Sequence, residues 1–157
     1  MSKLYRLTFK QNIPSNIETV WKFISSPNNL KLITPPKMGF NIVSEMDSDK
    51  MYPGQIIAYK VSPVAGIKLN WVTEITHVRE NEYFVDEQRF GPYTLWHHKH
   101  FVKAIKNGVE MVDIIDYKIP FGWLGDLANS LLVKKQLAEI FDYRFKKMVE
   151  IYGPYGE

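Results

Sequence analysis

The stretch LWHHKHFVKAIKNGVEMVDIIDYKIP, Leu95 to Pro120, predicts two antiparallel strands joined by a tight turn. Asn107-Gly108 is a strong hairpin signal, since both residues tolerate the backbone that a two-residue turn needs. One register makes these two residues the turn; the other moves the turn one residue earlier and places His100 directly opposite Asp113. Because side chains alternate along a strand, both registers leave the same residues on one face. These are His98, His100, Asp113, Ile115 and Tyr117.

This shared face is predicted to point inward, because Val109, Met111 and Ile119 make it mainly apolar. A buried polar group without a partner costs about 1–3 kcal/mol, so we expect Asp113 to accept a hydrogen bond from His100. Three interpretations are open. The group can fix strand pairing and the core, form the polar part of a ligand site, or be a metal triad of two histidines and one carboxylate.

The segments before this hairpin extend the sheet. Lys3–Ile13 alternates as a half-buried strand, and the region from Met38 to Pro120 predicts six antiparallel strands separated by turn residues. Between them, Pro14 and the sequence SNIE predict a short helix capped by Ser15, and SPNNL predicts a second one that begins at Ser26.

After the hairpin, the apolar residues return to helical spacing and predict one long amphipathic helix, Leu124–Tyr152, which includes Leu131 on its apolar stripe. The order of elements predicts an α+β fold in one domain, residues 1–157. A seven-stranded curved antiparallel sheet would wrap around the long helix, with two short helices after the first strand. Where sheet and helix diverge, an internal cavity is expected.

Composition excludes several classes of function. The 157 residues include no cysteine, so disulfide and thiolate chemistry is absent. No apolar run reaches the roughly 18 residues that cross a bilayer, and no leader-like segment begins the chain, so a cytoplasmic protein without stable membrane insertion is expected. A net charge of +3 without an RNA-binding signature argues against a nucleic-acid partner.

Four segments in order resemble one family. They are IPSNIETVWKFISSPNNLKLITPP, VDEQRFGPYTLWHHKHF, DYKIPFG and LVKKQLAEIFDYR. The whole chain resembles the START-like SRPBCC superfamily, which has the helix-grip fold, and these segments are similar to its bacterial ligand-binding subgroup related to polyketide cyclases and dehydrases. The resemblance implies a fold and a pocket for an apolar ligand. It implies no metal, and activity does not transfer with a fold.

The expected function is therefore the binding of a small, mostly apolar molecule, with no cofactor and no metal. The residues expected to line its site are Trp71, Trp96, His98, His100, Met111, Asp113, Ile115, Tyr117 and Leu131. A cyclase or dehydratase that uses His98, His100 and Asp113 as acid and base is the alternative, and a protein-interaction module is the third possibility.

Other polar residues are expected outside the site. The turn at Gly91-Pro92 leaves the facing of Asp86, Gln88 and Arg89 open, and each is expected on the surface or in the hairpin rather than in the pocket. His97 is expected to be exposed, and Asp142, Arg144 and His77 are expected to be structural.

Overall fold

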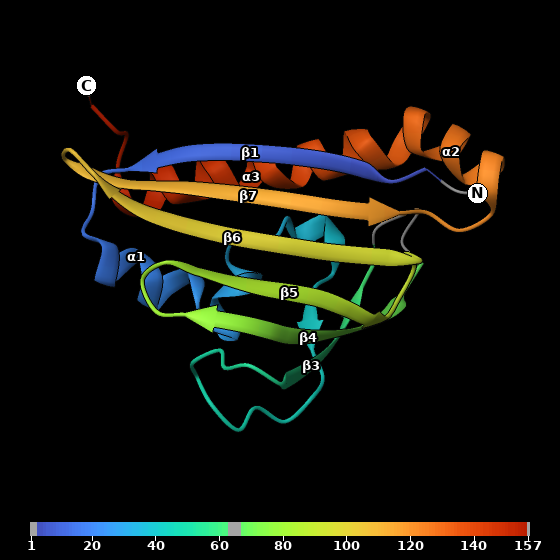
Figure 1. Ribbon diagram of the computed structural model, residues 1–157, viewed down its shortest axis with the longest axis horizontal. Coiled ribbons are helices and arrows are strands. Elements are labelled where there is room, and N and C mark those ends of the chain that lie inside the picture. The colour runs from blue at the N-terminus through green and yellow to red at the C-terminus, as the bar shows by residue number, and fades with distance from the viewer. Residues whose placement is uncertain (1–2, 63–66, 157) are drawn as a thin grey trace.

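The computed structural model describes residues 3–62 and 67–156 and contains one seven-stranded antiparallel sheet (Figure 1). The strand order is β1-β7-β6-β5-β4-β3-β2, so the first strand of the chain pairs with the last. The strands are β1 (Tyr5–Ile13), β2 (Asn41–Ile42), β3 (Gln55–Val61), β4 (Leu69–Arg79), β5 (Tyr83–Phe90), β6 (Leu95–Ile105) and β7 (Gly108–Lys118). The seven strands and their antiparallel order confirm the predicted sheet.

Short helices follow β1, as predicted. They are α1 (Ile17–Ile24), the 3-10 turn η1 (Pro27–Lys31) and the 3-10 turn η2 (Pro36–Met38). The cap of α1 differs from the prediction, because the side chain of Asn16 rather than Ser15 accepts the hydrogen bond, from the backbone N–H of Thr19 at 2.8 Å. Asn16 is one residue closer to the first helical turn, and its longer side chain reaches the third residue of the helix.

The C-terminal helical region has three parts: α2 (Gly122–Ala128), the π-helical turn η3 (Asn129–Val133) and α3 (Lys134–Tyr152). In Figure 1, α3 runs behind β1 and β7 along the sheet, while α2 lies beyond the end of the strands. Leu137, Phe141 and Met148 are the buried residues of α3. The ring of Phe141 stacks on Phe9 of β1 with 4.0 Å between centroids, which fastens the helix to the sheet.

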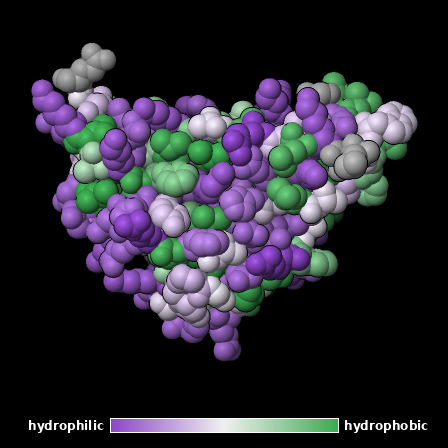
Figure 2. Space-filling view, in the orientation of Figure 1, coloured by the Kyte–Doolittle hydropathy of each residue, from purple (hydrophilic) through white to green (hydrophobic). Residues whose placement is uncertain are grey.

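The apolar stripe expected along Leu124–Tyr152 is wrong for its first third. Leu124, Leu127 and Leu131 are 53%, 51% and 72% exposed. The π turn η3 adds a residue to the helical repeat, and each added residue rotates the following side chains by about 100°. The stripe before η3 therefore does not continue into the buried face of α3. Hydrophobic side chains accordingly gather on the surface at the α2 end of the molecule (Figure 2).

The β6–β7 hairpin adopts the second of the two predicted registers, with Ile105 opposite Gly108 and His100 opposite Asp113. Asn107 has a positive φ of 62° and occupies the turn, whereas Gly108 begins β7. A Cβ atom on Gly108 would lie 2.2 Å from the carbonyl oxygen of Ile13. Glycine is needed here for the close approach of β1 rather than for the turn.

Among the described residues, no helix combines the length and apolarity needed to cross a membrane.

Candidate functional site

A cavity of about 150 Å³ lies between α3, the η1–η2 region and the inner face of strands β3 to β6. Its wall is mostly apolar and aromatic, and includes Ile57, Tyr59, Trp71, Phe84, Tyr93, Trp96, Leu137, Ile140 and Phe141. Pockets for drug-sized ligands usually measure about 300–1,000 Å³, whereas an apolar cavity of about 150 Å³ holds a molecule the size of benzene. The volume of the cavity therefore corresponds to about one aromatic ring.

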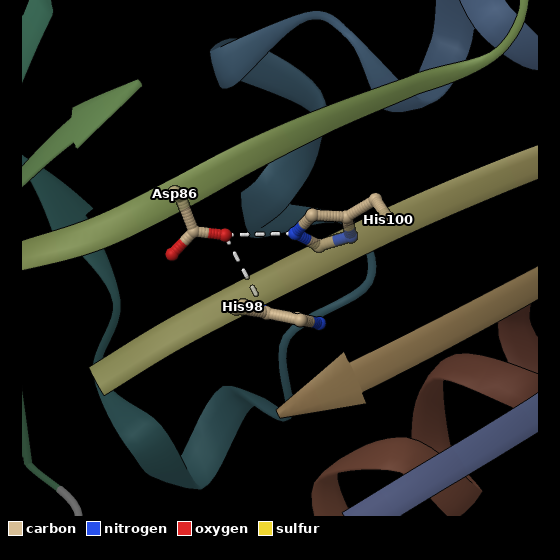
Figure 3. A group of neighbouring side chains, drawn as sticks. All are labelled: Asp86, His98 and His100. Atoms are coloured by element: carbon tan, nitrogen blue, oxygen red, sulfur yellow. Dashed lines mark hydrogen bonds and ion pairs between the residues drawn. The ribbon is translucent and has the colours of Figure 1, made fainter. Parts of the chain in front are cut away.

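Three polar side chains converge at one end of this cavity: Asp86 from β5, and His98 and His100 from β6 (Figure 3). Asp86 Oδ2 lies 2.7 Å from His100 Nε2 and 3.4 Å from His98 Nδ1. The two imidazole rings are 3.7 Å apart between centroids, and both histidines are buried. Trp96 Nε1 donates to the other oxygen of Asp86 at 3.3 Å, so both oxygens of this carboxylate have partners.

Asp113 of β7 lies on the other side of the two histidines. Its Oδ1 atom is 2.9 Å from His98 Nε2 and 2.8 Å from His100 Nδ1. Arg144 of α3 brings its Nη1 atom to 3.5 Å from the same oxygen. The histidines are thus held between two carboxylates, and a buried cation balances the second one.

The protonation states follow from this arrangement. Burial alone would raise the pKa values of Asp86 and Asp113, but their contacts with His98 and His100 outweigh burial and lower both. Burial lowers the pKa of His98, and repulsion from His100 adds to this effect. The pKa of His100 is raised, because its hydrogen bonds to Asp113 and Asp86 overcome the effect of burial. The two carboxylates thus favour the charged form of His100, whereas burial disfavours that of His98.

Aromatic side chains form the wall next to this polar end. Trp96 meets Trp71 edge to face at 5.2 Å between centroids and lies 4.9 Å from Tyr93. Trp71 Nε1 donates to Thr73 Oγ1 at 3.0 Å, and the hydroxyl groups of Thr73 and Tyr59 are also 3.0 Å apart. These indole and hydroxyl groups satisfy one another, so the wall presents mainly ring faces and edges to the cavity.

The structure separates the predicted site residues into three groups. Trp71, Trp96, His98 and His100 line the cavity. Met111 and Asp113 instead border a second hollow between β1, β7 and α3, while Ile115 and Tyr117 are fully buried in the core beneath α3. Leu131 is exposed on η3.

Two polar residues that line the cavity, Asp86 and Arg144, were not among the predicted site residues. Asp86 was expected on the surface or in the hairpin, but it pairs with His98 across the strands and faces inward. A two-residue turn at Gly91-Pro92 would pair Glu87 with Trp96, but the observed connection is longer and Glu87 pairs with His97. This shift of one residue turns the side chain of Asp86 to the inner face of the sheet. Arg144, expected to be structural, lines the cavity as well as pairing with Asp113.

The remaining polar residues lie outside the cavity. The amide of Gln88 binds the backbone of Tyr93 and holds the β5–β6 turn. Arg89 pairs with Glu74 at 2.5 Å on the outer face, and His97 lies 3.7 Å from Glu87 on that same face, with its side chain 35% exposed. Asp142 is exposed and pairs with Lys146, and His77 is exposed.

Comparison with solved structures identifies the fold. The chain is similar to a protein of Chromobacterium violaceum, with a TM-score of 0.70 and 10% identity over 96% of this chain and 98% of that one. A ginseng (Panax ginseng) major latex-like protein matches with a TM-score of 0.67 and 12% identity, covering 96% and 99% of the two chains. A protein of Thermus thermophilus matches with a TM-score of 0.65 and 20% identity, covering 93% and 95%.

Comparisons of sequence alone find less. No protein-family model matches the chain, and no curated protein matches it either. The structural matches, together with the seven-stranded sheet and the C-terminal helix, show that the chain has the helix-grip fold. At identities of 10–20% they show the fold and do not specify a ligand or a reaction.

Proposed function

We propose that this protein binds a small, mostly apolar molecule in the cavity between the sheet and α3. One observation carries the proposal: the cavity has a mostly apolar and aromatic wall into which the polar cluster of Asp86, His98 and His100 projects. Burial of the ligand's apolar surface supplies the affinity, at about 25 cal/mol per Å², and the polar end orients it. The volume of about 150 Å³ points to a single-ring compound with one polar substituent.

p-Cresol is a suitable probe, because it combines one apolar ring with one hydroxyl group. We expect it to raise the melting temperature of the native protein further as its concentration increases, as binding to the folded state requires. Ile140→Trp should abolish the shift, because Ile140 lines the cavity and the larger ring would fill it. Ile151→Trp, on the same helix at a 45% exposed position, is the matched control and should retain the full shift.

An unchanged shift in Ile140→Trp would place the probe elsewhere and contradict the proposal. In a separate experiment, native mass spectrometry of protein purified from its host would identify the physiological ligand by the mass that the protein retains.

Catalysis is the second candidate, favoured by the position of His98 and His100 on the cavity wall with a carboxylate on either side. An imidazole held in this way can remove and return a proton in a cyclisation or dehydration. Conversion of the retained molecule by the native protein, lost in His98→Gln and His100→Gln, would establish this activity. Retention of the molecule without conversion would favour ligand binding without catalysis.

A further inference from the structure

We propose that Asp86, His98 and His100 form a binding site for one divalent transition-metal ion at the polar end of the cavity. Each side chain offers one donor atom: Oδ2 of Asp86, Nδ1 of His98 and Nε2 of His100. Two imidazole nitrogens and one carboxylate oxygen, with further positions open, are the donor set of many transition-metal sites.

The spacing of the donor atoms suits an ion. The three atoms lie within 4.8 Å of one another, and Asp86 Oδ2 is 2.7 Å from His100 Nε2 and 3.4 Å from His98 Nδ1. Donors bound at about 2.0–2.2 Å to one ion lie about 3–4 Å apart, depending on the angle between them. The two Asp86 distances are close to this range, and rotation of the imidazole rings about their side-chain torsions would bring the two histidine nitrogens to it as well.

Asp113 provides the second, independent observation. Its Oδ1 atom accepts from the nitrogen of each histidine that points away from Asp86, at 2.9 Å for His98 and 2.8 Å for His100. Metal-binding histidines nearly always donate their other N–H to a carboxylate or carbonyl group, which fixes the tautomer and the ring orientation. Asp113 thus aims one nitrogen of each ring toward Asp86.

The open side of the site faces the cavity. Asp86, His98 and His100 all line it, whereas Asp113 lies behind the rings and borders the other hollow. Arg144 is close to Asp113, with 3.5 Å between Nη1 and Oδ1, and it balances that carboxylate rather than the donor triad. Water or an oxygen atom of a small molecule in the cavity can therefore complete the coordination of the ion.

Binding is an exchange of an ion for a proton. Imidazole nitrogen binds a metal ion only without its proton, so a proton on His100 Nε2, which lies 2.7 Å from Asp86 Oδ2, is lost when the ion binds. The ion takes the place of this proton, which leaves to solvent, while both N–H groups to Asp113 stay in place. His98 Nδ1 needs no such release, because the 3.4 Å distance to Asp86 is too long for a good hydrogen bond.

The test uses untagged protein that has been treated with a chelator and titrated with Co²⁺. We expect one Co²⁺ per chain, with visible d–d absorption of the intensity typical of nitrogen and oxygen donors at low coordination number. Zn²⁺ should displace it and raise the melting temperature of the native protein. Absence of both the visible band and the Zn²⁺ shift would overturn the proposal.

Variants locate the ion. Asp86→Asn, His98→Gln and His100→Gln should each lower the affinity for Zn²⁺ at least 100-fold, and Asp113→Asn should lower it about 10- to 100-fold. His97→Gln is the matched control, because His97 is on the same strand but on the outer face, and its affinity should stay within about twofold. Equal binding by Asp86→Asn and His97→Gln would overturn the assignment.

Circular dichroism checks that each variant is folded. If a histidine variant does not fold, Asp86→Asn decides the question, because asparagine keeps the shape of the side chain. Binding of p-cresol to the metal-free protein is measured separately, so a failure of the metal site and a failure of the ligand cavity give different results.

Discussion

At the scale of single residues, the main feature is a buried group of charges. Asp86 and Asp113 enclose His98 and His100, and Arg144 adds a cation beside Asp113. The side chains of Asp113 and Arg144 are only 8% and 11% exposed. Removing one member of such a pair leaves its partner buried without compensation, which costs more than the pair itself contributes.

Asp113→Asn should therefore lower the free energy of unfolding by about 3–5 kcal/mol, as measured by urea denaturation. The asparagine fits the site but leaves Arg144 without this anionic partner and His100 with Asp86 alone. Asp142→Asn is the control, since Asp142 is 63% exposed and pairs with the exposed Lys146, and its effect should stay within about 0.5 kcal/mol. Similar losses in the two variants would show that the buried carboxylate of Asp113 contributes no more to stability than the exposed carboxylate of Asp142.

Asp113 should also make the free energy of unfolding depend on pH. The pKa of Asp113 is lowered well below its usual range, because its hydrogen bonds to His100 and His98 and the charge of Arg144 outweigh the opposing effect of burial. Its contribution to stability is fully present above the pKa of the unfolded chain, about 3.9, and is lost as the pH falls toward the folded-state pKa.

The measurable quantity is the difference in unfolding free energy between the native protein and Asp113→Asn. We expect it to be greatest near pH 5 and to shrink steadily below about pH 4. A difference that stayed constant down to pH 2 would mean that folding does not lower the pKa of Asp113.

At the scale of elements, the C-terminal helical region has two functions in the fold. The α3 helix covers the sheet with Leu137, Phe141 and Met148, whereas η3 and α2 leave their leucines exposed. Leu137 of α3 is buried, whereas Leu124, Leu127 and Leu131 are exposed, so hydrophobicity in the sequence alone does not show which leucines stabilise the fold.

Leu137→Ala should lower the free energy of unfolding by about 2–5 kcal/mol, because Leu137 is 4% exposed and its removal leaves a cavity. Leu131→Ala removes the same atoms from a 72% exposed position and should change stability by no more than about 0.5 kcal/mol. Chemical denaturation of both variants tests the pair. A large loss in Leu131→Ala would show that η3 is covered in solution.

The β6–β7 hairpin gives a second prediction at this scale. A Cβ atom on Gly108 would lie 2.2 Å from the carbonyl oxygen of Ile13, so Gly108→Ala must push β1 away from β7. We expect a loss of about 1–3 kcal/mol in urea denaturation. Gly156→Ala, where nothing lies within 4 Å of the added atom, serves as the control and should be neutral. Equal stability of the two variants would show that β1 can move away from β7 without lowering the free energy of unfolding.

At the scale of the whole molecule, the features that can be predicted from the sequence are those that follow from local periodicity, such as which residues of a strand share a face. The alternation of Met111, Asp113 and Ile115 along β7 is sufficient to place them on one buried face in either register. The register itself depends on Gly108 meeting Ile13, a contact between segments that are distant in sequence. No local pattern contains that information.

The candidate site shows the same division. His98 and His100 could be placed inward from their own strand, but the facing of Asp86 depends on the length of the turn before Leu95. Arg144 reaches the site only because α3 crosses behind the sheet. Leu131 was misplaced because one π turn interrupts the helical period, and a regular repeat gives no warning of such a turn.

The strand order predicts how stability is distributed over the molecule. β7 lies between β1 and β6, so it is paired on both sides and the amides at its centre are released only when the middle of the sheet opens. β2 has two residues, Asn41 and Ile42, and occupies the opposite edge of the sheet. In native-state hydrogen exchange we expect the amides of Val112 and Ile114 to exchange only through global unfolding. Their exchange free energy should equal the denaturation value, whereas Ile42 should exchange several kcal/mol more easily. Comparable protection of β2 and β7 would contradict this order and would mean that the sheet opens as a single cooperative unit.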